Sequence, residues 1–305
     1  MQGFIVINAY PNGEKFYRQA NRIAKELRDL GVETEVFQNG EVSAWITDEG
    51  NVQTSLNETY DFCVYLDKDK YLGELLQVSG LRLFNSPQAV AVCDDKMSTY
   101  LALAEQGIPL VKTISAPLCY TPSAAASKTF LLRVAQELGF PLVAKKSYGS
   151  FGAGVRLVRD MDELMQVEAE WLYSPHFYQA FIEESKGRDV RVIVIGGRTV
   201  AAMERVAQDG EFRSNIELGG GGRTIDLPLE YAELAERVAR ALRLDYCGID
   251  LLKGADGGIV CEVNSNAFFE GLEGVTGVNI AAEYAKHIYT TVKNEKNDGK
   301  ALRKN

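Results

Sequence analysis

A glycine-rich loop follows directly on an apolar run that ends in lysine. Residues 142–145 have the length and composition of a short buried strand, and residues 147–154 read Ser-Tyr-Gly-Ser-Phe-Gly-Ala-Gly. Small residues leave backbone N–H groups able to point at an anion, and glycine lets the backbone approach a ligand closely. The GxxxxGKS/T pattern of a P-loop is absent. The segment therefore predicts either a phosphate-binding loop or a plain hairpin turn.

Two later apolar runs contain side chains with hard oxygen ligands. Asp250 lies within residues 248–252, and Glu262 and Asn264 are two positions apart in residues 259–264. Residues two apart in a strand face the same side, so Glu262 and Asn264 are predicted to point together. Such oxygens suit Mg²⁺. Water and nucleotide phosphates would complete the coordination shell of the ion. The alternative is that lysines or backbone groups satisfy these side chains.

Three arginines are candidates for binding an anion. Arg191 and Arg205 lie in otherwise apolar runs, where an unpaired cation would be unfavourable, and Arg213 follows a glycine-containing turn. The planar guanidinium group matches carboxylate and phosphate oxygens. Salt bridges to Glu204 or Glu217 are the alternative interpretation for any one of them.

Strand-like runs and helical segments alternate in the first part of the chain. Residues 4–7 and 34–37 read as strands, and between them apolar residues recur at helical spacing up to the stop signal Gly31. This alternation predicts a largely parallel sheet. The first loop lacks GxGxxG, so a dinucleotide fold is not supported. Further strands are expected at about 62–66, 81–84, 142–145, 155–158, 178–182, 190–195, 199–204, 248–252 and 259–263, and further helices at about 94–106, 123–138, 229–242 and 279–292.

The composition excludes several classes of protein. A chain of 305 residues is expected to form two or three packed domains, and its net charge of −9 argues against general nucleic-acid or membrane-surface binding. Five cysteines without a CxxC pair predict a reducing compartment. Neither a signal peptide nor a membrane-spanning run is recognised, so the cytoplasm is the expected location. The two histidines, His176 and His287, are given no role.

The order and spacing of these motifs resemble those of the RimK-like ATP-grasp ligases. The resemblance covers about residues 85–292. It implies an α/β protein in which a pre-ATP-grasp βαβ domain precedes a two-subdomain ATP-grasp fold of α+β character. The motifs are Asp95-Lys96, residues 141–145, the glycine-rich loop, Asp189-Val190-Arg191, Glu204-Arg205, residues 212–215, Gly248-Ile249-Asp250 and Glu262-Val263-Asn264. The implied boundaries are 1–85 for the N-terminal domain, 86–183 for the central subdomain with the lid, 184–292 for the C-terminal subdomain with the metal and substrate site, and 293–305 for a flexible tail.

The resemblance also implies an ATP site. Its residues would be Lys96, Lys145, Ser150, Gly152, Gln179, Ala180, Phe181, Ile182, Asp189, Arg213 and Asn215. The two lysines would hold phosphates beneath the lid loop 147–154, and the hinge 179–182 would contact adenine. Asp189 would meet the ribose hydroxyls, whereas Arg213 and Asn215 would lie on the phosphate and metal side.

Metal and catalytic roles follow from the same resemblance. Asp250, Glu262 and Asn264 would coordinate two Mg²⁺ ions, with Mn²⁺ as an alternative, and Arg205, helped by Arg191, would stabilise an acyl phosphate. The sequence departs from the family at two places. The hinge has Ala180 where a glutamate is usual, and residues 265–271 contain two phenylalanines where ribosomal-protein-modifying members have a Ser-Pro-Gly-like turn. The second departure concerns the acceptor rather than the ATP chemistry.

The implied activity is that of an ADP-forming carboxylate–amine ligase. The acid would be a peptide C-terminus or a small metabolite, and the amine an amino acid such as glutamate. No covalent enzyme nucleophile is required, consistent with the absence of a Ser-His or Cys-His arrangement. The alternatives are an ATP-binding regulator of the same fold without ligase activity, and a kinase that stops at phosphoryl transfer. Neither nucleic acid nor a membrane is expected as a partner, and a homo-oligomer is left open.

Overall fold

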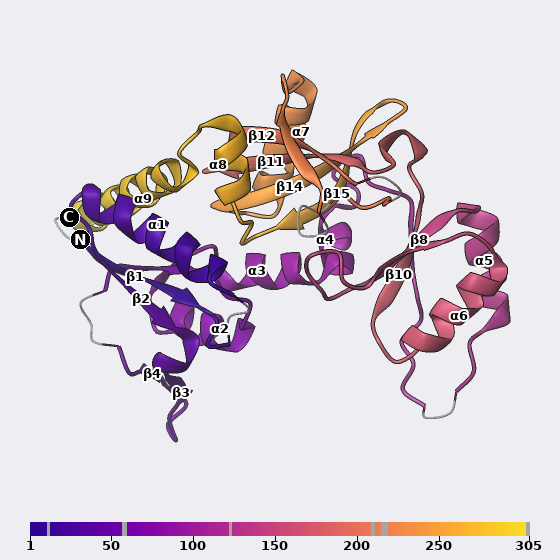
Figure 1. Cartoon of the computed structure of the whole chain (residues 1–305). Helices are drawn as coiled ribbons and strands as arrows, with labels where there is room; N and C mark the ends of the chain where they lie inside the picture. Colours follow the sequence, from indigo (N-terminus) through magenta and orange to yellow (C-terminus); the bar gives the residue numbers. More distant parts are fainter. Residues whose placement is uncertain (11–12, 57–59, 122–123, 209–210, 215–218, 303–305) are drawn as a thin grey trace.

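Three units of secondary structure make up the computed structural model of the chain (Figure 1). The structure describes residues 1–10, 13–56, 60–121, 124–208, 211–214 and 219–302. The N-terminal unit contains a parallel sheet, whereas the central and C-terminal units each contain an antiparallel sheet. This arrangement confirms the expected α/β class with an α+β second part.

The N-terminal sheet is parallel, as the alternation of strands and helices predicted. Its strand order is β2-β1-β5-β6. Because β2 lies on one side of β1 and β5 on the other, the strand order reverses between β1 and β5, where α/β sheets bind ligands beyond the strands' carboxyl ends. The elements are β1 (Gln2–Ile7), α1 (Lys15–Asp29), β2 (Glu33–Gln38), η1 (Asn39–Glu41), β3 (Ala44–Ile46), β4 (Val52–Thr54), β5 (Phe62–Tyr65), α2 (Lys70–Val78) and β6 (Arg82–Phe84).

Two capped helices, α3 (Pro87–Asp94) and α4 (Lys96–Leu103), lead from this sheet to the central unit. The central sheet has the order β7-β10-β8-β9, and α5 and α6 contribute apolar residues to a core on one of its faces. That core is separate from those of the other units. The elements are β7 (Thr113–Ser115), α5 (Lys128–Leu138), β8 (Leu142–Lys146), β9 (Val155–Val158), α6 (Met161–Trp171) and β10 (His176–Ala180).

The C-terminal sheet has the order β13-β12-β11-β14-β15 and a core on each face. Helix α7 covers one face, while α8 and α9 contribute to the core on the other. The elements are η2 (Glu183–Ser185), β11 (Arg188–Ile195), β12 (Arg198–Val206), β13 (Gly221–Thr224), α7 (Leu229–Ala241), β14 (Tyr246–Gly254), β15 (Gly257–Asn264), α8 (Glu270–Thr276) and α9 (Ile280–Leu302).

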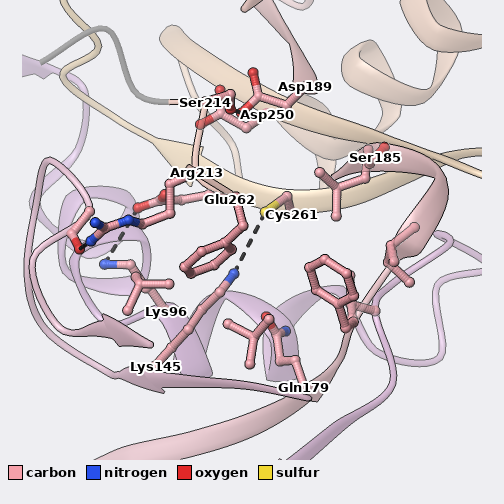
Figure 2. A pocket seen from close by; sticks show the side chains of 18 of the residues that line it. Lys96, Lys145, Gln179, Ser185, Asp189, Arg213, Ser214, Asp250, Cys261 and Glu262 are labelled. Atoms are coloured by element: carbon pink, nitrogen blue, oxygen red, sulfur yellow. Dashed lines mark hydrogen bonds and ion pairs between the residues drawn. The ribbon is translucent and has the colours of Figure 1, made fainter. Parts of the chain in front are cut away.

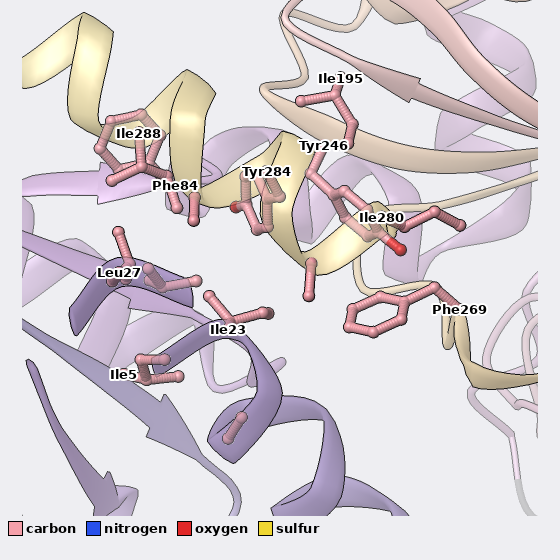
Figure 3. Packing of buried hydrophobic residues seen from close by; sticks show 14 of the residues in the cluster. Ile5, Ile23, Leu27, Phe84, Ile195, Tyr246, Phe269, Ile280, Tyr284 and Ile288 are labelled. Carbon is pink, nitrogen blue, oxygen red and sulfur yellow. The ribbon is translucent and has the colours of Figure 1, made fainter. Parts of the chain in front are cut away.

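The N-terminal and C-terminal units share one hydrophobic core (Figure 3). Helix α9 places Ile280, Tyr284 and Ile288 on one face because residues four apart lie one above the other. These side chains belong to the same buried cluster as Ile23 and Leu27 of α1. Burial of each large apolar side chain contributes roughly 1.5–3 kcal/mol. The shared core therefore fixes the N-terminal sheet beside the C-terminal one.

Helix α9 continues past residue 293, where the sequence predicted the start of a flexible tail. The helix extends to Leu302, and two of its polar residues make ion pairs with the N-terminal unit. Glu295 pairs with Arg82 at 3.4 Å, and Lys296 pairs with Asp61 at 2.6 Å. Polar composition predicted fraying, whereas tertiary ion pairs give these residues partners. Among the described residues, no helix combines the length and apolar character needed to cross a membrane.

Candidate active site

A pocket of about 110 Å³ lies between the central and C-terminal sheets (Figure 2). Three of the predicted site residues, Ser150, Arg191 and Asn264, line a neighbouring cleft instead. Asn215 lies outside the described residues. The remaining predicted residues all line the pocket: Lys96, Lys145, Gly152, Gln179, Ala180, Phe181, Ile182, Asp189, Arg205, Arg213, Asp250 and Glu262.

Two lysines enter the pocket from different elements. Asp95 caps α4 by accepting the N–H groups of Met97 and Ser98, and this places Lys96 at the first helical position. The Lys96 Nζ donates to the carbonyl of Gly149 at 2.5 Å and lies 3.4 Å from a Glu262 carboxylate oxygen. From β8, the Nζ of Lys145 lies 3.6 Å from the Cys261 sulfur. Both ammonium groups are thus positioned to bind an anion in the pocket.

The loop between β8 and β9 lies over these lysines and is held by side chains from three other segments. Besides the Lys96 bond, Arg213 donates to the carbonyl of Gly152 at 3.0 Å, and Lys68 donates to the Ser150 hydroxyl at 3.2 Å. Ligand pockets usually enclose about 300–1,000 Å³, so a pocket of about 110 Å³ is smaller than a nucleotide site requires. A nucleotide would therefore need more space beneath this loop than the pocket provides.

The hinge at the end of β10 offers backbone groups to a ligand. The N–H of Ala180 is already used, because it donates to the carbonyl of Lys112 at 3.0 Å. The N–H groups of Phe181 and Ile182 have no backbone acceptor within the described part of the chain. Next to the hinge, the buried Gln179 donates to the Thr113 hydroxyl at 2.9 Å. A ligand at the hinge would therefore meet the peptide groups beyond Ala180.

A chain of buried ion pairs crosses the C-terminal sheet beneath the pocket. Arg205 donates to both carboxylate oxygens of Asp189, at 2.7 and 2.6 Å, and its Nη2 lies 2.8 Å from Asp250. Arg191 also makes two hydrogen bonds to Asp250, one of them 2.8 Å long. The Ser214 hydroxyl donates to Asp189 at 2.5 Å. The alternative predicted from the sequence was that the arginines form salt bridges with Glu204 or Glu217. Arg205 and Arg191 instead pair with aspartates directly opposite them in the sheet.

Burial and charge act in opposite directions on the two aspartates. Burial raises the pKa of Asp189 and outweighs the attraction of Arg205. Burial also disfavours the charged form of Asp250, but Arg191 and Arg205 together hold its pKa below the ordinary value. Burial would likewise lower the pKa of Arg205, yet Asp250 and Asp189 raise it. Arg205 is therefore the cation that the two buried carboxylates share.

The predicted metal ligands present a mixed fit to Mg²⁺. No three His, Cys, Asp or Glu side chains gather as a metal site among the described residues, so the set depends on the amide of Asn264. That amide has no hydrogen-bond partner in the described ranges, and Glu262 is only partly covered by Lys96. Three N–H donors occupy Asp250, leaving about one of its four lone-pair sites. Glu262 and Asn264 fit an oxygen-ligated cation, with at most one bond from Asp250.

Cys261 lines the pocket although sequence reasoning did not assign it there. Alternation along a strand would turn it away from the face that Glu262 occupies. In the structure Asp250 pairs with Glu262 but Leu251 pairs with Val260, so Cys261 is the extra residue of a β-bulge. A bulge turns successive side chains towards one face. The register of β14 and β15 thus places the Cys261 thiol beside Lys145, and no motif in the sequence signals it.

A second cleft of about 480 Å³ adjoins the pocket, and sequence reasoning missed most of its lining. It lies beyond the carboxyl ends of β1 and β5, where the N-terminal strand order reverses. Asn8 directly follows β1, and Asp67 lies two residues after the end of β5. The other walls come from α1, from the end of α3, from the loop between β8 and β9, from β11, β12 and β15, and from residues 265–272. Arg205 and Glu262 line both cavities. The sequence signal that could have indicated this cleft is the presence of a polar residue, Asn8 or Asp67, after each of two parallel strands.

Comparisons with known proteins agree with this geometry. A model described as the RimK-like ATP-grasp domain matches residues 93–288. Beta-citrylglutamate synthase B of Homo sapiens is 38% identical over 230 residues, which are 74% of this chain and 58% of that protein. A probable alpha-L-glutamate ligase of Xanthomonas euvesicatoria pv. vesicatoria (strain 85-10) is 36% identical over 220 residues, which are 72% of each. The chain spans little more than half the length of the beta-citrylglutamate synthases.

Solved structures show the same fold at low sequence identity. The ATP-grasp ligase PsnB, complexed with a phosphomimetic variant of its minimal precursor, Mg and ADP, superposes with a TM-score of 0.69 at 20% identity, covering 95% of this chain and 98% of that one. D-alanine–D-alanine ligase from Bacillus anthracis, complexed with ATP, gives a TM-score of 0.71 at 17% identity, with coverages of 98% and 99%. The N-terminal sheet therefore belongs to the shared architecture.

Proposed function

The chain belongs to the RimK-like ATP-grasp family, and on this premise we propose that it is an ADP-forming ligase that joins a carboxylate to an amine. One observation carries the proposal. Arg205 and Glu262 line both the lysine-containing pocket and the larger second cleft. A nucleotide in the first cavity and an acid in the second would meet at these two residues.

The reaction requires activation of the acid because a carboxylate is a poor electrophile. The acid oxygen would attack the γ-phosphorus of ATP, which releases ADP and forms an acyl phosphate. An amine would then attack the acyl carbon, which releases phosphate and forms the amide. Such phosphoryl transfer depends mainly on positioning and on opposing the negative charge. Lys96 and Lys145 would hold the phosphates, and Arg205 would face the transferred group.

Glu262 and Asn264, with a single bond from Asp250, would hold Mg²⁺. The ion would neutralise phosphate charge and orient the β- and γ-phosphates. The Lys96 ammonium lies 3.4 Å from Glu262, so phosphate and metal would meet at the same corner of the pocket. Two ions and the use of Mn²⁺ remain predictions. A cytoplasmic location also remains a prediction.

An amino acid is the proposed amine, with glutamate as the first candidate. Curated relatives are named beta-citrylglutamate synthase, N-acetylaspartylglutamate synthase and probable alpha-L-glutamate ligase. Glutamate is common to all three names, whereas the acid differs. The amine is therefore the better supported of the two substrates.

The test is a matrix of acids and amines with ATP and Mg²⁺. ADP, phosphate and AMP are measured by chromatography, and amides by mass spectrometry. The expected result is ADP formation that needs both an acid and an amine, with an amide that contains glutamate. AMP and pyrophosphate as products would contradict the proposal. A phosphorylated acid without amide would instead identify a kinase, and nucleotide binding without turnover across the matrix would identify a regulator.

A further inference from the structure

Three phenylalanine rings from distant parts of the chain meet beside the second cleft. Phe16 belongs to α1, Phe151 to the lid loop, and Phe268 to the segment after β15. The rings of Phe151 and Phe268 are stacked with their centroids 6.1 Å apart, and Phe16 meets Phe268 edge-on at 5.1 Å. The ammonium of Lys15 lies 3.6 Å from the Phe151 centroid. We call these three phenylalanines the aromatic wall.

The aromatic wall is not part of the folding core. None of its rings belongs to a buried hydrophobic cluster of the described residues, whereas the adjacent Phe269 is 2% exposed and lies in the core of Figure 3. Phe151 is 39% exposed and has a φ of 58°, a left-handed conformation that bulky residues rarely adopt. Partly exposed, clustered apolar side chains mark binding surfaces. The wall is therefore available to a ligand.

The charged residues around the cleft are largely engaged with one another. Arg18 pairs with Glu270 at 2.9 Å, and Lys68 pairs with Asp94 at 2.5 Å. Within the sheet, Arg191 is bound to Asp250. The carboxylate of the remaining acidic residue on the N-terminal side, Asp67, accepts hydrogen bonds from the amides of Asn8 and Asn39. Because these charged groups already have ion-pair or hydrogen-bond partners, this part of the lining favours an apolar ligand body over a polyanion.

Resting on the proposed ligase function, we propose that the aromatic wall is the specificity subsite for the acid, and that this acid carries an aromatic or branched apolar body. The reacting carboxylate lies at the Arg205 and Glu262 end of the cleft, and the apolar body contacts the rings. Aromatic rings recognise such a body by stacked or edge-on contact. Phe151 belongs to the nucleotide lid, so closure of the lid over ATP also completes the acid subsite.

A binding experiment tests this subsite without turnover. Phe268→Trp introduces a fluorophore into the wall, and 3-phenylpropionate and citrate are titrated with a non-hydrolysable ATP analogue and Mg²⁺ present; the parent protein gives the background from Trp45 and Trp171. A saturable emission change with 3-phenylpropionate and none with citrate is expected. Adding Phe151→Ala should weaken the 3-phenylpropionate response at least fivefold. A response to citrate alone, no response to either acid, or an unchanged response after Phe151→Ala would overturn the proposal.

A kinetic experiment separates this subsite from the ligase activity itself. With glutamate as amine, kcat/KM for 3-phenylpropionate is expected to exceed that for citrate at least tenfold. Phe268→Ala should raise KM for 3-phenylpropionate about tenfold and change kcat little, because the ring contacts the acid body rather than the reacting atoms. The matched control is Tyr71→Ala, which removes an exposed ring beneath Lys70 outside the cleft and should change neither constant. If citrate is turned over more efficiently than 3-phenylpropionate, the proposed subsite is wrong but the ligase function is supported. If 3-phenylpropionate binds saturably but no ADP forms, the subsite is supported and the ligase function is wrong.

Discussion

Replacing Arg205 with methionine is expected to destabilise the fold by about 3–5 kcal/mol, the range for removing one partner of a buried ion pair. Arg205 is 4% exposed and makes contacts of 2.6–2.8 Å with two aspartates that are themselves 8% and 3% exposed. Methionine fills much of the same space without charge. Among the described residues, Asp189 then keeps the Ser214 hydroxyl as its side-chain donor, whereas Asp250 keeps Arg191.

The loss of stability in the Arg205→Met variant should be smaller at low pH than at high pH. In the parent protein burial already raises the pKa of Asp189, and loss of Arg205 removes the main opposing charge. A carboxyl group with a raised pKa binds more protons in the folded than in the unfolded state, so stability falls as pH rises through that interval. The variant should therefore recover part of its deficit when the pH is lowered from 8 towards 5.

Thermal unfolding followed by circular dichroism checks both points. At roughly 2 °C per kcal/mol for a chain of this size, the expected decrease in Tm is about 6–10 °C at pH 8. Adding Asp189→Asn should restore part of the lost Tm, because it removes the buried carboxylate that no longer has an arginine partner. The matched control is Arg223→Met, which removes an exposed arginine from its pair with Glu204 in the same sheet and should change Tm little. A Tm within 2 °C of the parent for Arg205→Met, or an equal deficit at both pH values, would refute the reasoning.

Three further predictions concern the nucleotide and metal site. Glu262→Gln should lower the rate of ADP release ~10²-fold, equivalent to at least about 3 kcal/mol of activation free energy, because it removes a negative charge from the proposed Mg²⁺ site. The Tm should not change. Steady-state measurement of ADP release tests this, and a near-normal rate would show that Glu262 is not a metal ligand. Mg·ATP should increase hydrogen-exchange protection of residues 147–154, because phosphate gives the lid new partners; mass spectrometry that finds equal protection with and without nucleotide would contradict a lid. ATP should exceed GTP at least about tenfold in kcat/KM, because the peptide groups beyond Ala180 mismatch guanine and leave polar groups unpaired. Ala180→Glu should change this ratio little, and equal use of GTP by the parent enzyme would disprove the hinge assignment.

Local patterns in the sequence were sufficient to predict which kinds of secondary structure form the N-terminal and central units. Alternating strands and helices predicted the parallel N-terminal sheet, and the antiparallel hairpin of β8 and β9 appears where a strand, a glycine loop and a second strand were expected. The period of two along a strand also placed Glu262 and Asn264 on one cleft. These features depend on neighbours in the chain, so the chain order alone contains the information.

The sequence-level account was weakest where position depends on contacts between elements. The polar end of α9 was expected to be a flexible tail, but Arg82 and Asp61, more than 200 positions away, pair with its residues. The hairpin of β3 and β4, strand β13 and helix α8 were not anticipated, since each is short and has little periodicity of its own. Such elements form because the rest of the fold supplies a surface for them.

The types and order of the residues already specify the chemical groups of the site: two lysines, a glycine loop, three arginines and the oxygen ligands. Which of these groups pair with one another depends on how the strands and domains pack. Arg205 faces Asp189, and Arg191 faces Asp250, because the registers of β11 with β12 and with β14 place them directly opposite. A bulge in β15 adds Cys261 to the pocket. The aromatic wall brings together residues 16 and 268. Register, bulges and the docking of domains are set by packing summed over many residues, and no local stretch of sequence contains that sum.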